Sequence, residues 1–126
     1  MKNHPIVNAD IKTIADSIQK ETPAFEGKAF LISGGAGFLG SYFVATLLHL
    51  NKEFFCKPAH ITILDNFITG SKQNTIVDII GNPEVEFIEH DVRQVVPSGL
   101  EADYLIHAAG LASPFYYQKY PLETIE

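Results

Sequence analysis

The sequence predicts an α/β fold with one parallel β-sheet and flanking helices, truncated after about four strands. Apolar runs of strand length alternate with helical patterns and polar loops, as in βαβ units. A glycine cluster at residues 34–40 joins the first strand to the first long helix of the sheet domain, and Asp65 ends the second strand. Right-handed crossovers bring the carboxyl ends of such strands to one edge, where sheets of this kind bind ligands.

An N-terminal helical appendage over residues 1–26 precedes the sheet. Four apolar residues recur there at helical spacing: Ile11, Ile14, Ala15 and Ile18. Asn8 is the expected N-cap, and the pair Thr22-Pro23 is expected to end the helix. We expect the apolar stripe to pack against the main domain or against a partner subunit.

The main domain, residues 27–126, carries the strands. They are expected at residues 28–33, 61–65, 85–89 and 104–107, which are short runs rich in apolar residues. A helix from Phe38 to about Leu50 should bury one face formed by Phe43, Leu47 and Leu50. A shorter helix is expected at residues 75–80, and at most a helical turn between residues 91 and 103. A sheet of four strands should leave an apolar edge and face uncovered.

Composition indicates a globular domain and excludes several classes of function. The chain has 126 residues, of which 46% are hydrophobic and 19% charged, enough for about one domain. A net charge of −6 argues against nucleic acid and anionic membranes as partners. The single cysteine, Cys56, excludes an internal disulfide, and the histidines lack metal-ligand spacing. Without a signal peptide or a membrane-spanning run, a cytoplasmic location is expected.

The glycine cluster satisfies the pattern G-x-x-G-x-x-G through Gly34, Gly37 and Gly40, and Gly35 adds the variant G-x-G-x-x-G. Glycines at this spacing permit a tight turn and let backbone N–H groups approach a pyrophosphate at a helix N-terminus. No Lys-Ser or Lys-Thr pair follows, which disfavours an NTPase loop. The alternative is a turn whose glycines serve packing alone. Nearby, the hydroxyls of Ser33 and Ser41 could bond near phosphates or satisfy local backbone.

Asp65 lies where a dinucleotide-binding fold presents a carboxylate to the adenosine ribose. A carboxylate accepts hydrogen bonds from the ribose hydroxyls and repels a 2′-phosphate, and no arginine follows in residues 66–68. The pattern therefore favours NAD over NADP. The alternative is an aspartate that only begins a turn.

Polar and small residues also follow the third and fourth strands. Asp91 could accept the adenine amino group while Val92 donates its backbone N–H, or Asp91 could cap a turn or helix. The run His107-Ala-Ala-Gly110 would let a cofactor pass close to the backbone. We expect His107 itself to be a buried structural residue.

Four of these segments together resemble the extended short-chain dehydrogenases/reductases, the NAD-dependent epimerase/dehydratase family. They are Ile32-Ser-Gly-Gly-Ala-Gly-Phe-Leu-Gly-Ser41, Asp65-Asn-Phe-Ile-Thr-Gly70, Glu89-His-Asp-Val92 and Ala112-Ser-Pro-Phe-Tyr-Tyr117. The resemblance spans about Gly27 to Pro121 and is closest to the UDP-glucuronate decarboxylases. The dTDP-glucose 4,6-dehydratases and UDP-sugar 4-epimerases are the alternatives. A Rossmann-type sheet is implied.

The resemblance also implies contacts with NAD and a substrate class. The pyrophosphate would contact Gly37, Phe38 and Leu39, beside Gly34 and Gly40. The adenosine ribose would contact Asp65, Asn66, Phe67 and Thr69, and the adenine would contact Asp91 and Val92. The nicotinamide-side ribose would lie near Ala108, Ala109 and Gly110. The substrate would be a UDP- or dTDP-linked sugar, oxidised at C4 by bound NAD. The full-length enzyme would be a homodimer.

This family's chemistry needs a Tyr-x-x-x-Lys pair, one helical turn apart, and the chain has none. At the position four residues after each of the five tyrosines the chain has, in order, Thr46, Ala108, Tyr120, Pro121 and Thr124, and none of these is a lysine. We therefore expect no catalytic residue here and an N-terminal part of a longer enzyme, inactive by itself. A non-catalytic NAD-sensing or scaffold protein and a plain structural domain remain alternative hypotheses.

Overall fold

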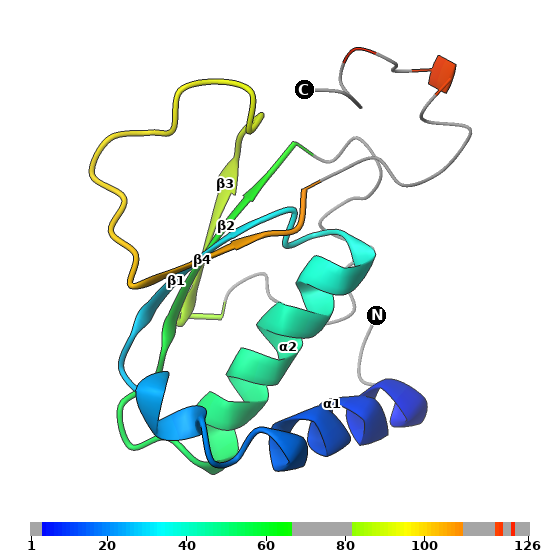
Figure 1. The fold of residues 1–126 in the computed structure, drawn as a ribbon, viewed down its shortest axis with the longest axis vertical. Helices are drawn as coiled ribbons and strands as arrows, with labels where there is room; N and C mark the ends of the chain where they lie inside the picture. The colour runs from blue at the N-terminus through cyan, green and yellow to red at the C-terminus, as the bar shows by residue number, and fades with distance from the viewer. Residues whose placement is uncertain (1–3, 67–81, 110–117, 120–121, 123–126) are drawn as a thin grey trace.

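A computed structural model of the chain describes residues 4–66, 82–109, 118–119 and 122. Its four strands form one parallel sheet in the order β3-β2-β1-β4 (Figure 1). They are β1 (Ala29–Ser33), β2 (His60–Asp65), β3 (Val85–Glu89) and β4 (Tyr104–His107). The predicted parallel α/β sheet is confirmed, and each strand boundary lies within one residue of its expected place. The helix predicted at residues 75–80 lies outside the described residues.

The helix α2 (Phe38–Glu53) connects β1 to β2 and runs along one face of the sheet (Figure 1). It begins where predicted but extends beyond Leu50. The buried Asn51 permits the extension, because its side chain donates to the Ala59 carbonyl at 2.9 Å and accepts the Ala59 N–H at 2.7 Å. These bonds satisfy a buried amide and fix the last turns of the helix to the start of β2.

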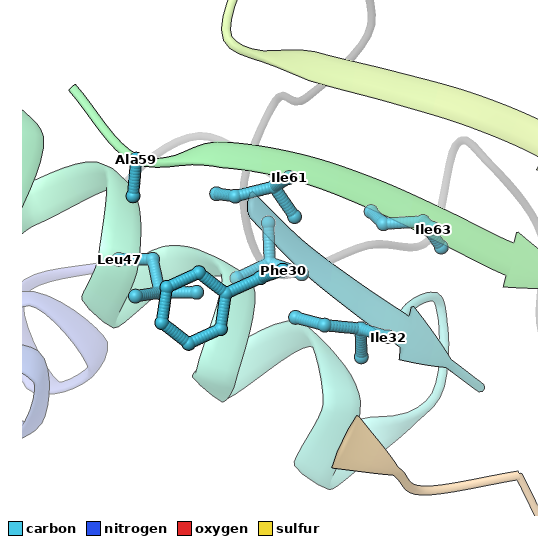
Figure 2. Packing of buried hydrophobic residues seen from close by; sticks show 7 residues of the cluster. Phe30, Ile32, Leu47, Ala59, Ile61 and Ile63 are labelled. Carbon is cyan, nitrogen blue, oxygen red and sulfur yellow. The ribbon is translucent and has the colours of Figure 1, made fainter. Parts of the chain in front are cut away.

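The hydrophobic core lies between this helix and the two central strands. Phe30 pairs with Ile61, and Ile32 with Ile63, in the parallel register of β1 and β2. Alternate residues of a strand point to the same face, so these four side chains lie on one face of the sheet, where Val44 and Leu47 of α2 belong to the same buried cluster (Figure 2). The expected burial of Phe43 is wrong. Its side chain is 46% exposed, while the neighbouring Val44 is fully buried in this core.

The N-terminal helix α1 (Pro5–Ser17) lies beside α2, and Ile11 and Ala15 are its buried residues. The expected packing against the domain is confirmed for Ile11 and Ala15, whereas Ile14 of the same stripe is 38% exposed. Asn8 is not the N-cap, because the helix begins one turn earlier: Pro5 takes the first helical position and His4 Nδ1 accepts the Ile6 N–H at 3.3 Å. The helix also ends before Thr22-Pro23, which instead opens a short 3₁₀ helix, η1 (Thr22–Ala24).

Within the described residues, β4 is the last strand on its side of the sheet, and Leu105 is 67% exposed. An apolar groove of about 840 Å³ lies between α1, α2 and β4, lined among others by Ile14, Phe43 and Leu105. The expected uncovered apolar edge is therefore present. The connection at residues 90–103 carries no helix. It has a turn at residues 92–93, where the Gln94 N–H donates to the Asp91 carbonyl at 2.9 Å, and a second turn at residues 98–99.

Ile63 links the core to the glycine cluster, because a Cβ on Gly35 would come within 2.6 Å of its side chain. We expect Ile63→Ala to lower the free energy of unfolding by about 2–5 kcal/mol, since a buried cavity remains, and Ile63→Val by about 0.5–1.5 kcal/mol. Urea denaturation measures both, with Val95→Ala as an exposed control expected to stay within about 0.5 kcal/mol of the parent chain. Equal losses for the two Ile63 variants would contradict tight packing.

Candidate functional site

The carboxyl ends of all four strands are tied into one edge of the sheet. Three backbone hydrogen bonds join them: Gly34 N–H to Leu64 O at 2.7 Å, His90 N–H to Asp65 O at 2.9 Å, and Ala108 N–H to Ser33 O at 2.9 Å. The residues that follow β1, β2, β3 and β4 therefore start from neighbouring points. Four sequence segments that are far apart in the chain contribute to this edge.

Two of the cluster's glycines are required by close contacts between backbones. Gly34 has a φ of +75°, and a Cβ there would lie 2.6 Å from the backbone of Ala108 and Ala109. A Cβ on Gly40 would overlap the carbonyl oxygen of Gly34. Glycine at these positions lets the end of β1 approach β4 and lets the first turn of α2 pack onto the loop.

The third glycine of the pattern, Gly37, has a different environment. It is the N-cap of α2, with extended backbone and no side-chain cap, and the first turn of the helix contains no acidic residue. The first N–H groups of a helix have no partner within the helix, and its dipole is positive at this end. This end of α2 can therefore bind an anion such as a pyrophosphate. A Cβ on Gly37 would be 3.2 Å from Gly34 O, a milder conflict than at Gly34 or Gly40.

Phe38 and Leu39 follow Gly37 at the start of α2, and their side chains are 74% and 65% exposed. They contribute little to the core. Their position places their backbone N–H groups at the same helix end as Gly37. The three residues that the resemblance implies at the pyrophosphate, Gly37, Phe38 and Leu39, therefore lie together at the N-terminus of α2.

Asp65 ends β2, and its Oδ2 accepts the N–H of Ala36 at 2.9 Å. This bond holds the middle of the glycine loop against the end of β2. A carboxylate has about four lone-pair positions, so it can accept several N–H or O–H donors at once. An aspartate that only begins a turn does not account for a bond to a residue 29 positions away. Sequence reasoning missed Ala36, because nothing in its side chain marks its N–H as a donor.

Asp91 lies just after β3 and is bonded to Arg93. Its Oδ1 accepts the Arg93 backbone N–H and Nε, each at 3.0 Å, and its Oδ2 accepts Nε at 3.0 Å and Nη2. The side-chain bonds from Arg93 are the main cause that lowers the pKa of Asp91 from 3.8 to about 2; the Arg93 N–H and the charges of Arg93 and His90 add to this, against the effect of burial. Asp91 therefore caps this turn, and its contact with the adenine stays a prediction. Val92, between the two, is 38% exposed.

The serine hydroxyls near the loop are occupied within the fold. Ser41 Oγ donates to the carbonyls of Gly37 at 2.6 Å and Phe38 at 3.0 Å, at the start of its own helix. Ser33 Oγ is 2.6 Å from Nδ1 of His107 on the adjacent strand. These contacts favour the hypothesis that both serine hydroxyls satisfy groups of the fold itself rather than a phosphate. The expectation of a buried His107 is wrong, because β4 borders the described sheet and leaves the ring exposed.

Most of the predicted cofactor residues lie on the four segments that meet at this edge. They are Gly34, Gly37, Phe38, Leu39, Gly40, Asp65, Asn66, Asp91, Val92, Ala108 and Ala109. Phe67, Thr69 and Gly110 lie outside the described residues, as does the segment Ala112–Tyr117. In the described ranges no three histidine, cysteine or acidic side chains gather as a metal site. None of the helices that the structure describes is long and apolar enough to span a bilayer.

Comparison with known proteins agrees with this geometry. The model of the NAD dependent epimerase/dehydratase family matches residues 30–126. UDP-glucuronic acid decarboxylase 3 of Arabidopsis thaliana is 42% identical over 96 residues, which are 76% of this chain and 25% of that protein. UDP-glucuronic acid decarboxylase 1 of Danio rerio is 39% identical over 99 residues, 79% of this chain and 21% of that protein. The chain thus spans about a quarter of the length of these relatives.

Solved structures show the same fold. A UDP-N-acetylglucosamine 4-epimerase from Methanobrevibacter ruminantium, in complex with UDP-N-acetylmuramic acid, superposes with a TM-score of 0.60 at 25% identity, over 79% of this chain and 29% of that one. An epimerase from Methanothermobacter thermautotrophicus gives a TM-score of 0.63 at 23% identity, over 86% of this chain and 30% of that one. The four-stranded sheet is therefore a Rossmann-type sheet.

Gly34 and Gly99 provide a matched pair for testing the close contact at this edge. Both have positive φ, +75° and +85°, but a Cβ on Gly99 would meet nothing within 4 Å. We expect Gly99→Ala to cost about 1–2 kcal/mol of unfolding free energy, from backbone strain alone. Gly34→Ala should cost clearly more, because backbone atoms at 2.6–2.7 Å must also move. Urea denaturation compares the two, and equal costs would contradict the contact with Ala108.

Proposed function

Because this chain belongs to the NAD-dependent epimerase/dehydratase family, we propose that it is the NAD-binding part of a nucleotide-sugar-modifying enzyme of the UDP-glucuronic acid decarboxylase type. Its cofactor is NAD. The observation that carries the proposal is the uncapped N-terminus of α2, entered through Gly37 and lying beside the carboxylate of Asp65. The helix N-terminus suits the pyrophosphate of an adenosine diphosphate, and the carboxylate suits the hydroxyls of its ribose.

The residues at the edge fit NAD in a defined order. The N–H groups of Gly37, Phe38 and Leu39 would hold the pyrophosphate, and Asp65 would accept the adenosine ribose hydroxyls, with Asn66 next to it. Asp91 and Val92 would face the adenine. The small residues Ala108 and Ala109, which lie against Gly34, would leave room for the nicotinamide-side ribose. NAD, when bound, supplies a hydride acceptor.

In the whole protein the substrate would be a UDP-linked sugar, as the names of the relatives suggest. Oxidation of its C4 hydroxyl would give a ketone that labilises the neighbouring position, and reduction would complete the cycle. The similarity to a 4-epimerase structure supports epimerisation as the second candidate. The present chain has no Tyr-x-x-x-Lys pair to take the proton of the C4 hydroxyl while the hydride passes from C4 to NAD, so we propose that it binds NAD without turnover. A homodimer of the whole enzyme is part of the proposal.

Replacement of Asp65 tests the binding proposal. We expect Asp65→Asn to lower NAD affinity by about tenfold or more, because charged acceptors of the ribose hydroxyls are lost. The variant keeps an oxygen for the Ala36 N–H. It should also narrow the preference for NAD over NADP, since the repulsion of a 2′-phosphate is removed. Isothermal calorimetry with both dinucleotides measures the two effects.

Asp103→Asn is the matched control for this measurement. The Asp103 carboxylate also accepts a backbone N–H, that of Ala29 at 2.8 Å, but at the opposite end of β1. Its replacement should leave NAD affinity unchanged. Equal losses in the two variants would mean that folding, not ribose binding, is affected, and no NAD binding by the parent chain would favour a structural domain.

The absence of turnover is tested separately. We expect the 126-residue chain, given NAD and UDP-glucuronic acid, to release no carbon dioxide and to accumulate no reduced cofactor, since no tyrosine and lysine pair is present. The Arabidopsis relative serves as the positive control. Substantial conversion by the chain alone would contradict this proposal, while NAD binding without turnover also fits an NAD-sensing or scaffold role.

A further inference from the structure

Ser33 and His107 form a side-chain hydrogen bond that links the ends of β1 and β4 and that the proposed cofactor site does not use. They are the last paired residues of the two strands in the parallel register. Ser33 Oγ lies 2.6 Å from His107 Nδ1, and the Ala108 N–H donates to the Ser33 carbonyl at 2.9 Å. Ser33 is therefore bonded to the end of β4 twice, through its side chain and through its backbone.

The donor in the side-chain bond is the serine hydroxyl. Ser33 is only 3% exposed, and within the described residues its hydroxyl makes no hydrogen bond other than that with His107. A neutral imidazole has one nitrogen that accepts a hydrogen bond and one that carries a hydrogen. If Nδ1 carried the hydrogen, the buried hydroxyl would be left without an acceptor, which is unfavourable. From these hydrogen bonds we assign the ring hydrogen of His107 to Nε2.

The residues that follow this pair on the two strands are in close contact. Gly34 comes after Ser33, and a Cβ on Gly34 would lie 2.6 Å from backbone atoms of both Ala108 and Ala109. The strand β4 has only four residues and, within the described part of the sheet, pairs with β1 alone. The end of a short border strand opens at a low free energy, because few bonds hold it. One more bond at that end, between two side chains, therefore matters for where these residues lie.

We propose that Ser33 and His107 are positioning residues for the nicotinamide-side ribose. Their hydrogen bond holds the end of β4 against β1, so that Ala108 and Ala109 keep the close contact with Gly34 that leaves room for the sugar. The inference rests on the proposed function, in which the nicotinamide-side ribose lies near these alanines. The adenosine diphosphate half is bound by other segments, the N-terminus of α2 and the end of β2, and does not depend on this hydrogen bond.

The test compares NAD with ADP, which has the adenosine and the pyrophosphate but no second ribose. We expect Ser33→Ala to lower the affinity for NAD by about two- to tenfold, the range that corresponds to the loss of one hydrogen bond, and to leave the affinity for ADP unchanged. Ser33→Thr keeps the hydroxyl and should bind NAD as the parent chain does. Isothermal calorimetry measures both ligands, and binding of ADP shows that each variant is folded.

Two replacements of His107 separate positioning from direct contact with the ligand. Asparagine carries an oxygen at the place of Nδ1 and can still accept the Ser33 hydroxyl, whereas glutamine places its amide near Nε2. We expect His107→Asn to keep the affinity for NAD and His107→Gln to lose it as Ser33→Ala does. His60→Asn is the matched control. His60 is an exposed histidine at the start of β2, 3.9 Å from Glu86, and its replacement should leave both affinities unchanged.

The ring nitrogens provide a spectroscopic measurement of the same bond. NMR of the neutral ring should show His107 with its hydrogen on Nε2 and with Nδ1 as the acceptor. In Ser33→Ala this preference should weaken toward that of an imidazole in water. A hydrogen on Nδ1 in the parent chain would contradict the assigned direction of the bond and overturn the inference.

The affinities distinguish the remaining outcomes. Equal losses for NAD and ADP in Ser33→Ala would overturn the inference, because the whole edge would then be disturbed. Unchanged NAD affinity in Ser33→Ala would overturn it too. Loss in His107→Asn with retention in His107→Gln would do the same, and would show that Nε2 contacts the dinucleotide directly. Binding of neither NAD nor ADP by the parent chain would refute the proposed function itself, and the inference with it.

Discussion

The close approach of backbone to backbone between the end of β1 and the start of α2 is the constraint on which the candidate site depends. A Cβ on Gly40 would overlap the carbonyl oxygen of Gly34, and a Cβ on Gly34 would meet Ala108. Only residues without side chains allow these distances. The result is that α2 begins directly at the strand ends, so that its N-terminal N–H groups and the tips of β2 and β4 share one edge.

The loop inside this contact is held from several directions. The Gly34 carbonyl accepts the Gly37 N–H at 3.0 Å, Asp65 accepts the Ala36 N–H, and the side chain of Ile63 lies beneath Gly35. These bonds fix the backbone before any ligand arrives. A preorganised loop loses little conformational entropy on binding, so more of the attraction between the helix end and an anion is available as affinity. Ile63 belongs to the core of Figure 2, and the loop is thereby anchored in the most buried part of the domain.

The sequence was sufficient to predict features that arise from local patterns. Strand periodicity placed all four strands within one residue, and the glycine spacing marked the start of α2. Features that arise from distant partners were missed. The extension of α2 past Leu50 depends on bonds between Asn51 and Ala59, and the exposure of Phe43 and His107 depends on which elements cover α2 and β4. At the N-terminus the sequence offered two possible helix starts, and the helix begins at Pro5 rather than after Asn8.

The described residues at this edge carry groups that suit the binding of a dinucleotide. The backbone N–H groups at Gly37 and the carboxylates of Asp65 and Asp91 can orient a dinucleotide. The small side chains after β4 leave room for it. Oxidation of a sugar hydroxyl needs a base that reaches it and removes its proton, and the sequence contains no tyrosine followed four residues later by lysine. The chain spans about a quarter of the length of its decarboxylase relatives. In the proposed function, the glycine loop and Asp65 account for cofactor binding, and use of the cofactor needs further residues that the loop itself does not indicate.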